Sequence, residues 1–116
     1  MIQIQRIYDA PPAGKNRYLV DRLWPRGIKK DSVEMEAWLK DAAPSNDLRK
    51  WYAHDPARWD EFRARYRQEL DANPSAWQPL LDGARRGPLV LLYSSKEREL
   101  NNAAALKEYL EAWLGS

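Results

Sequence analysis

Apolar and polar residues alternate at the start of the chain and then give way to a loop. Isoleucine and glutamine alternate over residues 2–5, and this period of two predicts a first strand at about residues 2–8. Two prolines and a glycine within residues 9–14 cannot continue a ladder of strand hydrogen bonds, so we expect a loop there. Residues 17–21 are predicted to form a second strand.

A later apolar run shows no alternation. Residues 89–93 read Leu-Val-Leu-Leu-Tyr, which is typical of a strand that is buried on both faces. We therefore predict a central parallel strand at this position.

Residues 31–40 fit two kinds of element. Asp31 and Glu34 have the spacing of a capping box at the start of a helix. Over residues 33–40, however, Val, Met, Ala and Leu occupy every second position, and this alternation favours a strand. We interpret the segment as a strand, with a helix as the alternative.

Three longer segments and one short segment carry helix signals. Asp55 is a favourable N-cap for a helix over 56–71, and the proline after it is tolerated at a first helical position. Further helices are predicted over about 75–86 and 101–114, and a short one is expected to end at about residue 52. The residues expected to face inward are Trp59, Phe62, Tyr66 and Leu70 in the first helix, Trp77, Leu80, Leu81 and Ala84 in the second, and Leu106, Leu110, Trp113 and Leu114 in the third.

Together these elements predict an α/β fold. We expect one domain over residues 1–116, a layered sandwich with a small, mostly parallel sheet and helices packed on it. The 116 residues are 44% hydrophobic, which is enough for a core of ordinary size. Nineteen basic and seventeen acidic residues leave a net charge of +2, which is too balanced to require nucleic acid or an anionic membrane as a partner.

The composition removes several kinds of chemistry. The sequence has no cysteine and one histidine, so disulfides, thiolate catalysis and cysteine- or histidine-rich metal sites are excluded, and we expect no metal and no cofactor. No apolar run approaches the ~20 residues of a membrane span, and Met1 leads directly into a strand pattern. We therefore expect a cytoplasmic protein without a membrane partner.

A group of polar side chains follows the second predicted strand. Arg22 and Arg26 stand on either side of Trp24 and Pro25, and arginine binds phosphate or carboxylate through paired hydrogen bonds. Pro25 stiffens the loop, which would hold the two guanidinium groups in place. The structural alternative is that Asp21 and Arg22 form an ordinary ion pair and that Trp24 belongs to the core.

A second polar group follows the predicted central strand. Ser94, Ser95 and Lys96 come after this strand and before a helix that starts near Asn101. In an open α/β sheet, ligands bind beyond the carboxyl ends of the strands, near helix N-termini. We therefore predict an anion site here, with a capping loop and a solvated Lys96 as the structural alternative. The glycines of a nucleotide-binding loop are missing.

Several motifs together resemble a known family, the YeaO-like branch of DUF488. The resemblance covers nearly the whole chain, and the family name states that its function is unassigned. The residues that carry it are Asp21 to Gly27, Trp38-Leu39-Lys40, Ala43-Pro44-Ser45, Leu48 to Trp51, His54-Asp55-Pro56, Leu91-Leu92-Tyr93 and Lys96.

The resemblance also implies which side chains are altered here. The wider DUF488 family has an Asp/Arg-Pro stretch, which Asp21, Arg22 and Pro25 match. Its late strand carries a Cys, and a Cys-His-Arg element follows. This sequence has Tyr93 and Asn101 at the two cysteine positions. Asn102 and Ala103 replace the His and Arg of that element, and within the YeaO-like branch Leu100 and Asn102 replace histidines. These replacements argue against thiol or imidazole chemistry in this chain.

We infer a pocket for a phosphate- or carboxylate-bearing small molecule, with catalysis left open. In this hypothesis the cations hold the anion and the hydroxyl and amide groups orient it, while Asp21 is the candidate general base. We expect the charge of Arg22 to lower the pKa of Asp21, which would make it a weak base. The predicted ligand-binding residues are Asp21, Arg22, Arg26, Ser94, Ser95, Lys96 and Asn101.

Two other functions remain open. Arginines on the predicted helices, together with Trp51, could form a nucleic-acid-binding face, although acids at helical spacing favour an ordinary solvated surface. The chain could also be a structural domain that binds a protein partner. His54 is interpreted as a packed or capping side chain.

Overall fold

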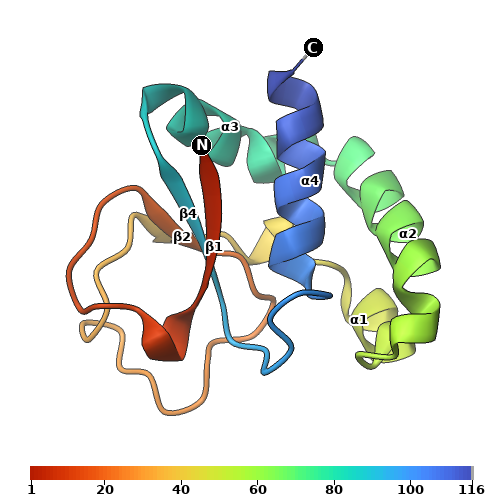
Figure 1. The fold of residues 1–116 in the computed structure, drawn as a ribbon, viewed down its shortest axis with the longest axis horizontal. Coiled ribbons are helices and arrows are strands. Elements are labelled where there is room, and N and C mark those ends of the chain that lie inside the picture. Colours follow the sequence, from red (N-terminus) through yellow and green to blue (C-terminus); the bar gives the residue numbers. More distant parts are fainter. Residues whose placement is uncertain (116) are drawn as a thin grey trace.

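The computed structural model describes residues 1–115 and consists of one parallel sheet with helices. The sheet order is β1-β4-β2-β3, and each neighbouring pair is parallel. The apolar run is the inner strand that pairs with both β1 and β2, as the sequence predicts (Figure 1). The α/β prediction is therefore confirmed; the strands are β1 (Ile2–Arg6), β2 (Arg17–Leu19), β3 (Ala37–Trp38) and β4 (Leu89–Tyr93).

The helices form where the sequence predicts them, with small differences at their ends. Pro56–Arg58 form a turn of 3₁₀ helix before α2, because the Asp55 carboxylate accepts from the Ala57 amide at 3.0 Å. Asn101 is the N-cap of α4 and not its first residue. The four helices are α1 (Asn46–Tyr52), α2 (Trp59–Asp71), α3 (Pro74–Arg86) and α4 (Asn102–Leu114).

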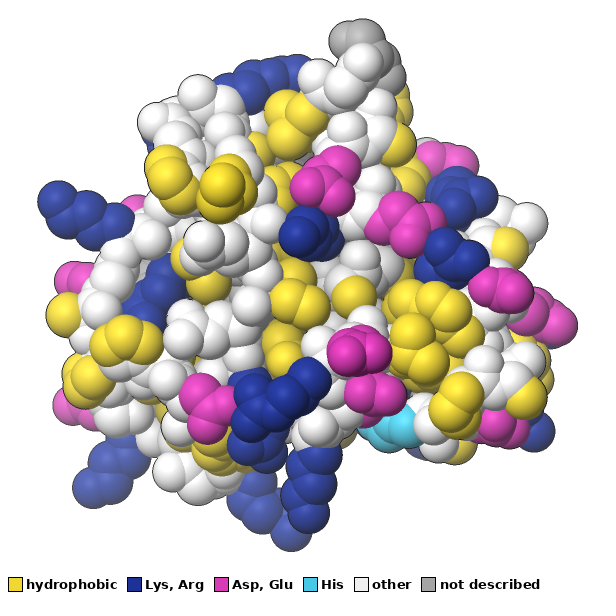
Figure 2. All heavy atoms as spheres, in the orientation of Figure 1, with side chains coloured by type: hydrophobic (Ala, Val, Ile, Leu, Met, Phe, Trp, Pro, Cys, Tyr) yellow, Lys and Arg dark blue, Asp and Glu magenta, His cyan; other side chains and the backbone are white. Residues whose placement is uncertain are grey.

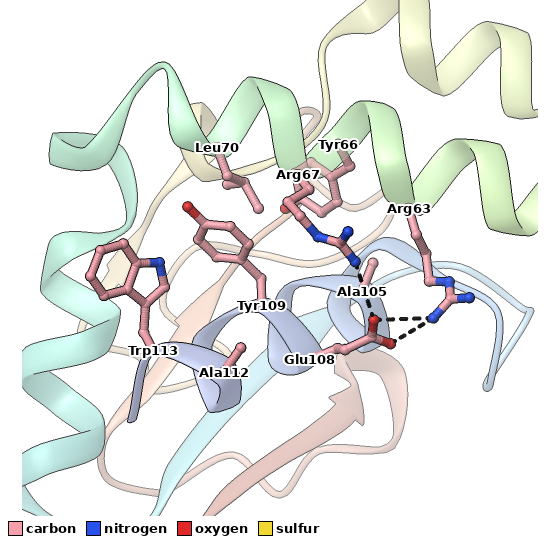
Figure 3. Close-up of a pocket in the computed structure, with 9 residues that line it drawn as sticks. All are labelled: Arg63, Tyr66, Arg67, Leu70, Ala105, Glu108, Tyr109, Ala112 and Trp113. Atoms are coloured by element: carbon pink, nitrogen blue, oxygen red, sulfur yellow. Dashed lines mark hydrogen bonds and ion pairs between the residues drawn. The ribbon is translucent and has the colours of Figure 1, made fainter. Parts of the chain in front are cut away.

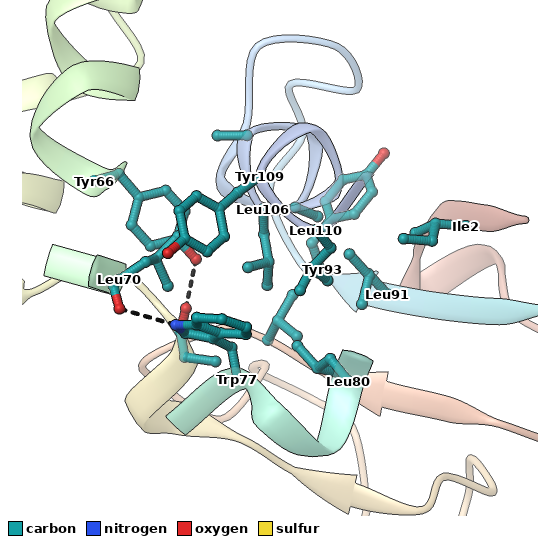
Figure 4. Packing of buried hydrophobic residues seen from close by; sticks show 14 of the residues in the cluster. Ile2, Tyr66, Leu70, Trp77, Leu80, Leu91, Tyr93, Leu106, Tyr109 and Leu110 are labelled. Carbon is teal, nitrogen blue, oxygen red and sulfur yellow. Dashed lines mark hydrogen bonds between the residues drawn. The ribbon is translucent and has the colours of Figure 1, made fainter. Parts of the chain in front are cut away.

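The helices and one face of the sheet enclose the larger core. Leu91 and Tyr93 of β4 point into this core, where they meet Leu106 and Leu110 of α4 (Figure 4). Trp77 of α3 donates a hydrogen bond to the Leu70 carbonyl at 2.8 Å, so its ring is buried without leaving its N–H unpaired. In Figure 1 the helices lie together beside the sheet.

An irregular segment covers the other face of the sheet. Leu19 and Leu92 point to this side, where Val33 is buried against them and Trp24 and Met35 pack half-buried. β4 is therefore buried on both faces, although within residues 1–115 no α-helix contributes to this second core.

The predicted strand over 31–40 is confirmed only at β3. The alternation is real, because Val33 is buried while Glu34 and Glu36 on either side of Met35 are exposed. The segment runs extended along β2, where the Glu36 amide donates to the Arg17 carbonyl at 2.7 Å. Val33 and Met35 pack into the second core, whereas Ala37 and Leu39 pack against the larger one, so the period of two does not correspond to a single buried strand face.

The first two strands are also shorter than predicted. β1 ends at Arg6, and Ile7–Asp9 turn as a 3₁₀ helix. β2 ends at Leu19, although the next residue still bonds to the sheet: the Val20 amide donates to the Leu92 carbonyl at 3.1 Å. Asp21 therefore leaves the sheet directly after the last hydrogen bond to β4.

A buried arginine sets the start of β2. Arg17 is 2% exposed, and its guanidinium donates to the carbonyls of Pro11 and Pro12 at 2.8 and 3.1 Å. Gly14 packs against that guanidinium so closely that a Cβ there would lie 2.7 Å from the Arg17 Cζ. The proline-rich loop is thus tied to the strand that leads to Asp21. Among residues 1–115, no helix has the length and apolar character needed to cross a membrane.

We expect Tyr66→Phe to lower the free energy of unfolding by about 1–3 kcal/mol, because the buried Ala42 carbonyl would lose its hydrogen bond. Tyr8→Phe is the matched control. Tyr8 is 41% exposed, and water can replace its hydrogen bond to the Arg26 carbonyl, so a change below about 0.5 kcal/mol is expected. Urea denaturation measures both, and equal losses in the two variants would contradict the assignment.

Candidate functional site

The candidate site begins where β2 and β4 end side by side. Asp21 follows β2 and Ser94 follows β4. One carboxylate oxygen of Asp21, Oδ2, accepts from the Ser94 amide at 2.8 Å and from the Ser94 hydroxyl at 2.6 Å. The two strand ends are therefore joined by one side chain.

The first turn of α4 completes the enclosure of Asp21. The Asn102 side-chain amide donates to the Val20 carbonyl at 2.9 Å and to Asp21 Oδ1 at 3.1 Å. Asn101, which caps the same helix, is fully buried and accepts from the Ala104 amide at 2.8 Å. β2, β4 and α4 thus converge on one carboxyl group.

Burial raises the pKa of the Asp21 carboxyl, because desolvation disfavours its charged form. The hydrogen bonds from Ser94 and Asn102 and the charge of Arg49 oppose this shift but are smaller. The expectation that Arg22 would lower this pKa is wrong. Arg22 turns away, and its guanidinium donates to the Ala43 carbonyl at 3.0 Å, the Pro44 carbonyl at 3.3 Å and Asp41 at 3.3 Å.

A cavity of about 380 Å³ opens beside Asp21. Ser94, Ser95 and Asn102 line it from the strand end and from α4. Its apolar wall contains the buried rings of Tyr52 and Phe62. The other lining residues are Arg22, Leu23, Pro44, Arg49, Lys50, Ala53 and His54.

The C-terminal end of α1 brings cations to this cavity. Arg49 and Lys50 lie in the last turn of α1, and both are exposed. Ala53 and His54 follow at φ angles of 48° and 56°, in the left-handed region that residues other than glycine rarely adopt. The strained pair places its two residues on the cavity wall, and such strain is concentrated at functional sites.

Four of the seven sequence-predicted residues line this cavity: Asp21, Arg22, Ser94 and Ser95. The other three are not among its lining residues in the described part of the chain. Arg26 and Lys96 are exposed, and Asn101 is buried as a helix cap. The two arginines beside Trp24 and Pro25 therefore do not act as one clamp.

Sequence reasoning missed Arg49, Lys50, His54 and Asn102 as members of this site. The sequence offers no reason to bring Arg49 and Lys50 to this cavity, because nothing in it places α1 beside the end of β2. One signal was available for Asn102, since it stands in the first turn of a helix that follows the central strand.

A second cavity, of about 340 Å³, lies between α2 and α4. Arg63 and Arg67 of α2 reach over it toward Glu108 of α4, and Tyr109 and Trp113 line its apolar part (Figure 3). Within residues 1–115 both arginines are already paired, Arg67 with Glu108 and Arg63 with Glu108 and Asp60. Within residues 1–115, no three His, Asp or Glu side chains gather in a way that could hold a metal ion.

Arg63, Arg65, Arg67 and Arg85 on the helices are paired with acids, whereas Arg86 donates to the Tyr18 hydroxyl at 3.1 Å. Arg63 contacts Asp60 at 2.7 Å, and Arg85 contacts Asp82 at 3.9 Å. Acidic and basic side chains accordingly alternate over α2 in Figure 2. Trp51 has the guanidinium of Arg65 over its ring at 4.5 Å, and Arg58 lies at 5.2 Å from the ring centroid.

The whole chain, residues 1–116, matches the family model described as "Inactive DUF488-N3 subclade". The chain is 40% identical over 112 residues to the uncharacterized protein YeaO of Escherichia coli (strain K12), which covers 96% of this chain and 97% of that protein. It is 50% identical over 70 residues to the uncharacterized protein Rv3073c of Mycobacterium tuberculosis (strain ATCC 25618 / H37Rv), or 60% of this chain and 59% of that protein. No solved structure gives a significant match.

We expect the Asp21 carboxyl to titrate above its ordinary pKa of 3.8. The Ser94→Ala substitution should raise that pKa further, because it removes a hydrogen bond that stabilises the charged form. Ser32→Ala is the control, since the Ser32 hydroxyl bonds only to the nearby Lys29 carbonyl. Carboxyl ¹³C NMR titration measures the change, with the resonance assigned by its loss in Asp21→Asn.

The same shift has a consequence for stability. Because the pKa of Asp21 is higher in the folded state, the folded protein binds its proton more tightly than the unfolded chain does. The contribution to stability is complete below pH 3.8 and is lost as the pH rises through the folded-state pKa. A titration midpoint at or below 3.8 would contradict the burial argument.

Proposed function

The chain belongs to the DUF488 family, in the DUF488-N3 subclade described as inactive, and we propose that it is a binding protein. Its ligand would be a phosphate- or carboxylate-bearing small molecule, which the cavity beside Asp21 binds without transforming it. The description of the subclade favours binding over catalysis. Asp21, the candidate general base, accepts hydrogen bonds from Ser94 and Asn102 that hold its carboxyl group in place.

The observation that carries the proposal is the charge of the cavity wall. Arg22, Arg49 and Lys50 line one cavity, against a single acidic side chain, Asp21. Arginine and lysine are the side chains that bind phosphate and carboxylate in proteins. The volume of about 380 Å³ lies within the range of small-molecule sites.

The three cations differ in how free they are to bind a ligand. The Arg22 guanidinium already donates hydrogen bonds to two backbone carbonyls, and its side chain is 25% exposed. Arg49 makes one hydrogen bond, to the Asn46 side chain, at 3.2 Å. No hydrogen bond or ion pair of the Lys50 side chain is found within residues 1–115. Lys50 and Arg49 are therefore proposed as the main anion ligands, with Arg22 as a further positive charge.

The nucleic-acid alternative has weaker support. Base stacking would need a free aromatic face, whereas Trp51 already has guanidinium groups against its ring. On α2 and α3, Arg63, Arg65 and Arg85 form ion pairs with neighbouring acids. Binding to an oligonucleotide that weakens steeply with salt and ignores the cavity variants would favour this alternative.

A ligand that binds the folded state should raise the melting temperature, so we expect at least one compound in a thermal-shift panel of inorganic phosphate, sugar phosphates and nucleotides to do so. Replacing both Arg49 and Lys50 by alanine should weaken binding of that compound about tenfold or more, because two charge-assisted contacts are lost. The Lys15→Ala, Lys29→Ala double variant removes the same charge outside the cavity and should bind like the wild type. Equal weakening in both double variants would show that only net charge matters and would overturn the site.

A further inference from the structure

The residues that line the Asp21 cavity carry charges of both signs. The single acid stands at the strand ends, where Asp21 is half-buried between β2, β4 and α4. The cations Arg49 and Lys50 are exposed and belong to α1. Among the described lining residues, a ligand in this cavity therefore meets one acidic side chain together with the cations Arg22, Arg49 and Lys50.

Asp21 is only weakly compensated by positive charge, because the charge of Arg49 lowers its pKa by less than burial raises it. Within residues 1–115 it takes part in no ion pair, and the three hydrogen bonds it accepts come from the neutral groups of Ser94 and Asn102. The adjacent cation, Arg22, is turned toward Asp41 and two carbonyls. A carboxylate removed from water without a countercharge is costly, and desolvation accordingly raises the pKa of Asp21.

One oxygen of Asp21 has room for a further donor. Oδ2 accepts two hydrogen bonds from Ser94, whereas Oδ1 accepts only one, from Asn102. Each carboxylate oxygen can accept two, so Oδ1 can take another N–H. Asp21 is itself one of the lining residues of the cavity, so a bound molecule can reach it.

Part of the cavity wall is apolar. Leu23, Pro44, Tyr52, Ala53 and Phe62 line it, and the rings of Tyr52 and Phe62 stack with their centroids 4.3 Å apart. Such a wall suits a hydrocarbon segment, since burying methylene groups there removes apolar surface from water on both molecules.

We propose that the ligand of this cavity is a zwitterion, with an ammonium group that binds Asp21, an apolar middle, and a phosphate or carboxylate that binds Arg49 and Lys50. This inference rests on the proposed function and narrows it from anions in general to amino-bearing anions. A simple anion would be repelled by Asp21, which forms no ion pair within residues 1–115, whereas an ammonium group would be attracted to it.

Matched pairs of probes can distinguish a site for anions in general from a site for zwitterions. The probes are ω-aminoalkyl phosphates with two to five methylenes, each compared with the alkyl phosphate of the same chain length by isothermal titration calorimetry. At least one amino compound should bind the wild-type protein about tenfold or more tightly than its partner, because a charge-assisted hydrogen bond to a half-buried carboxylate is gained.

Variants then locate the effect. Asp21→Asn should abolish the advantage of the amino compound and leave the alkyl phosphate bound at least as tightly as before. Asp31→Asn, which removes an exposed acid outside the cavity, should preserve the advantage. Lys50→Ala should weaken both members of a pair by the same factor, since the phosphate is common to them.

The outcomes distinguish this inference from the proposed function. If the two compounds of every pair bind with equal affinity and their binding still depends on Lys50, the anion site is supported and the proposal of a zwitterionic ligand is wrong. If no probe binds in a Lys50-dependent way, both are wrong. The comparison within each pair uses the wild-type protein alone, so it decides the question even if Asp21→Asn does not fold.

Discussion

The carboxyl group of Asp21 is the point on which the organisation of this end of the molecule depends. It accepts hydrogen bonds from the amide and hydroxyl of Ser94 and from the side chain of Asn102, and so links the residues that follow β2 and β4 to the first turn of α4. A neutral side chain of the same size could make some of these bonds. The acid adds a half-buried negative charge, whose desolvation the three neutral donors offset only in part.

The rest of the cavity surrounds that charge with groups from distant parts of the sequence. Arg22 lies beside Asp21 in the chain but stabilises the backbone at Ala43 and Pro44, so it shapes the wall of the cavity instead of neutralising the acid. The cations that remain available come from α1, where the helix ends in the left-handed residues Ala53 and His54. Local strain and uncompensated charge thus occur in the same small region, as is common where a protein binds a ligand.

Much of the fold could be predicted because its signals are local. The unbroken apolar run identified β4 as the inner strand, and the caps Asp55 and Asn101 located the starts of two helices to within a few residues. The segment over 31–40 was harder, because an extended chain that buries every second side chain has the same period as a strand. Within the site, Asp21 and Ser94 could be paired from the rule for parallel sheets. Arg49 and Lys50 could not, since their position depends on how α1 packs against α2 and on a turn that the sequence does not mark with glycine.

The sheet order has a consequence for the way the chain acquires its structure. Both β1 and β2 pair with β4, so Ile2 lies opposite Leu89 and Tyr18 lies opposite Leu91. During synthesis these two early strands have left the ribosome long before their common partner exists, and they do not pair with each other. β1 and β2 are therefore expected to keep apolar residues exposed until residues 89–93 have left the ribosome. This dependence on distant contacts is typical of domains that fold slowly.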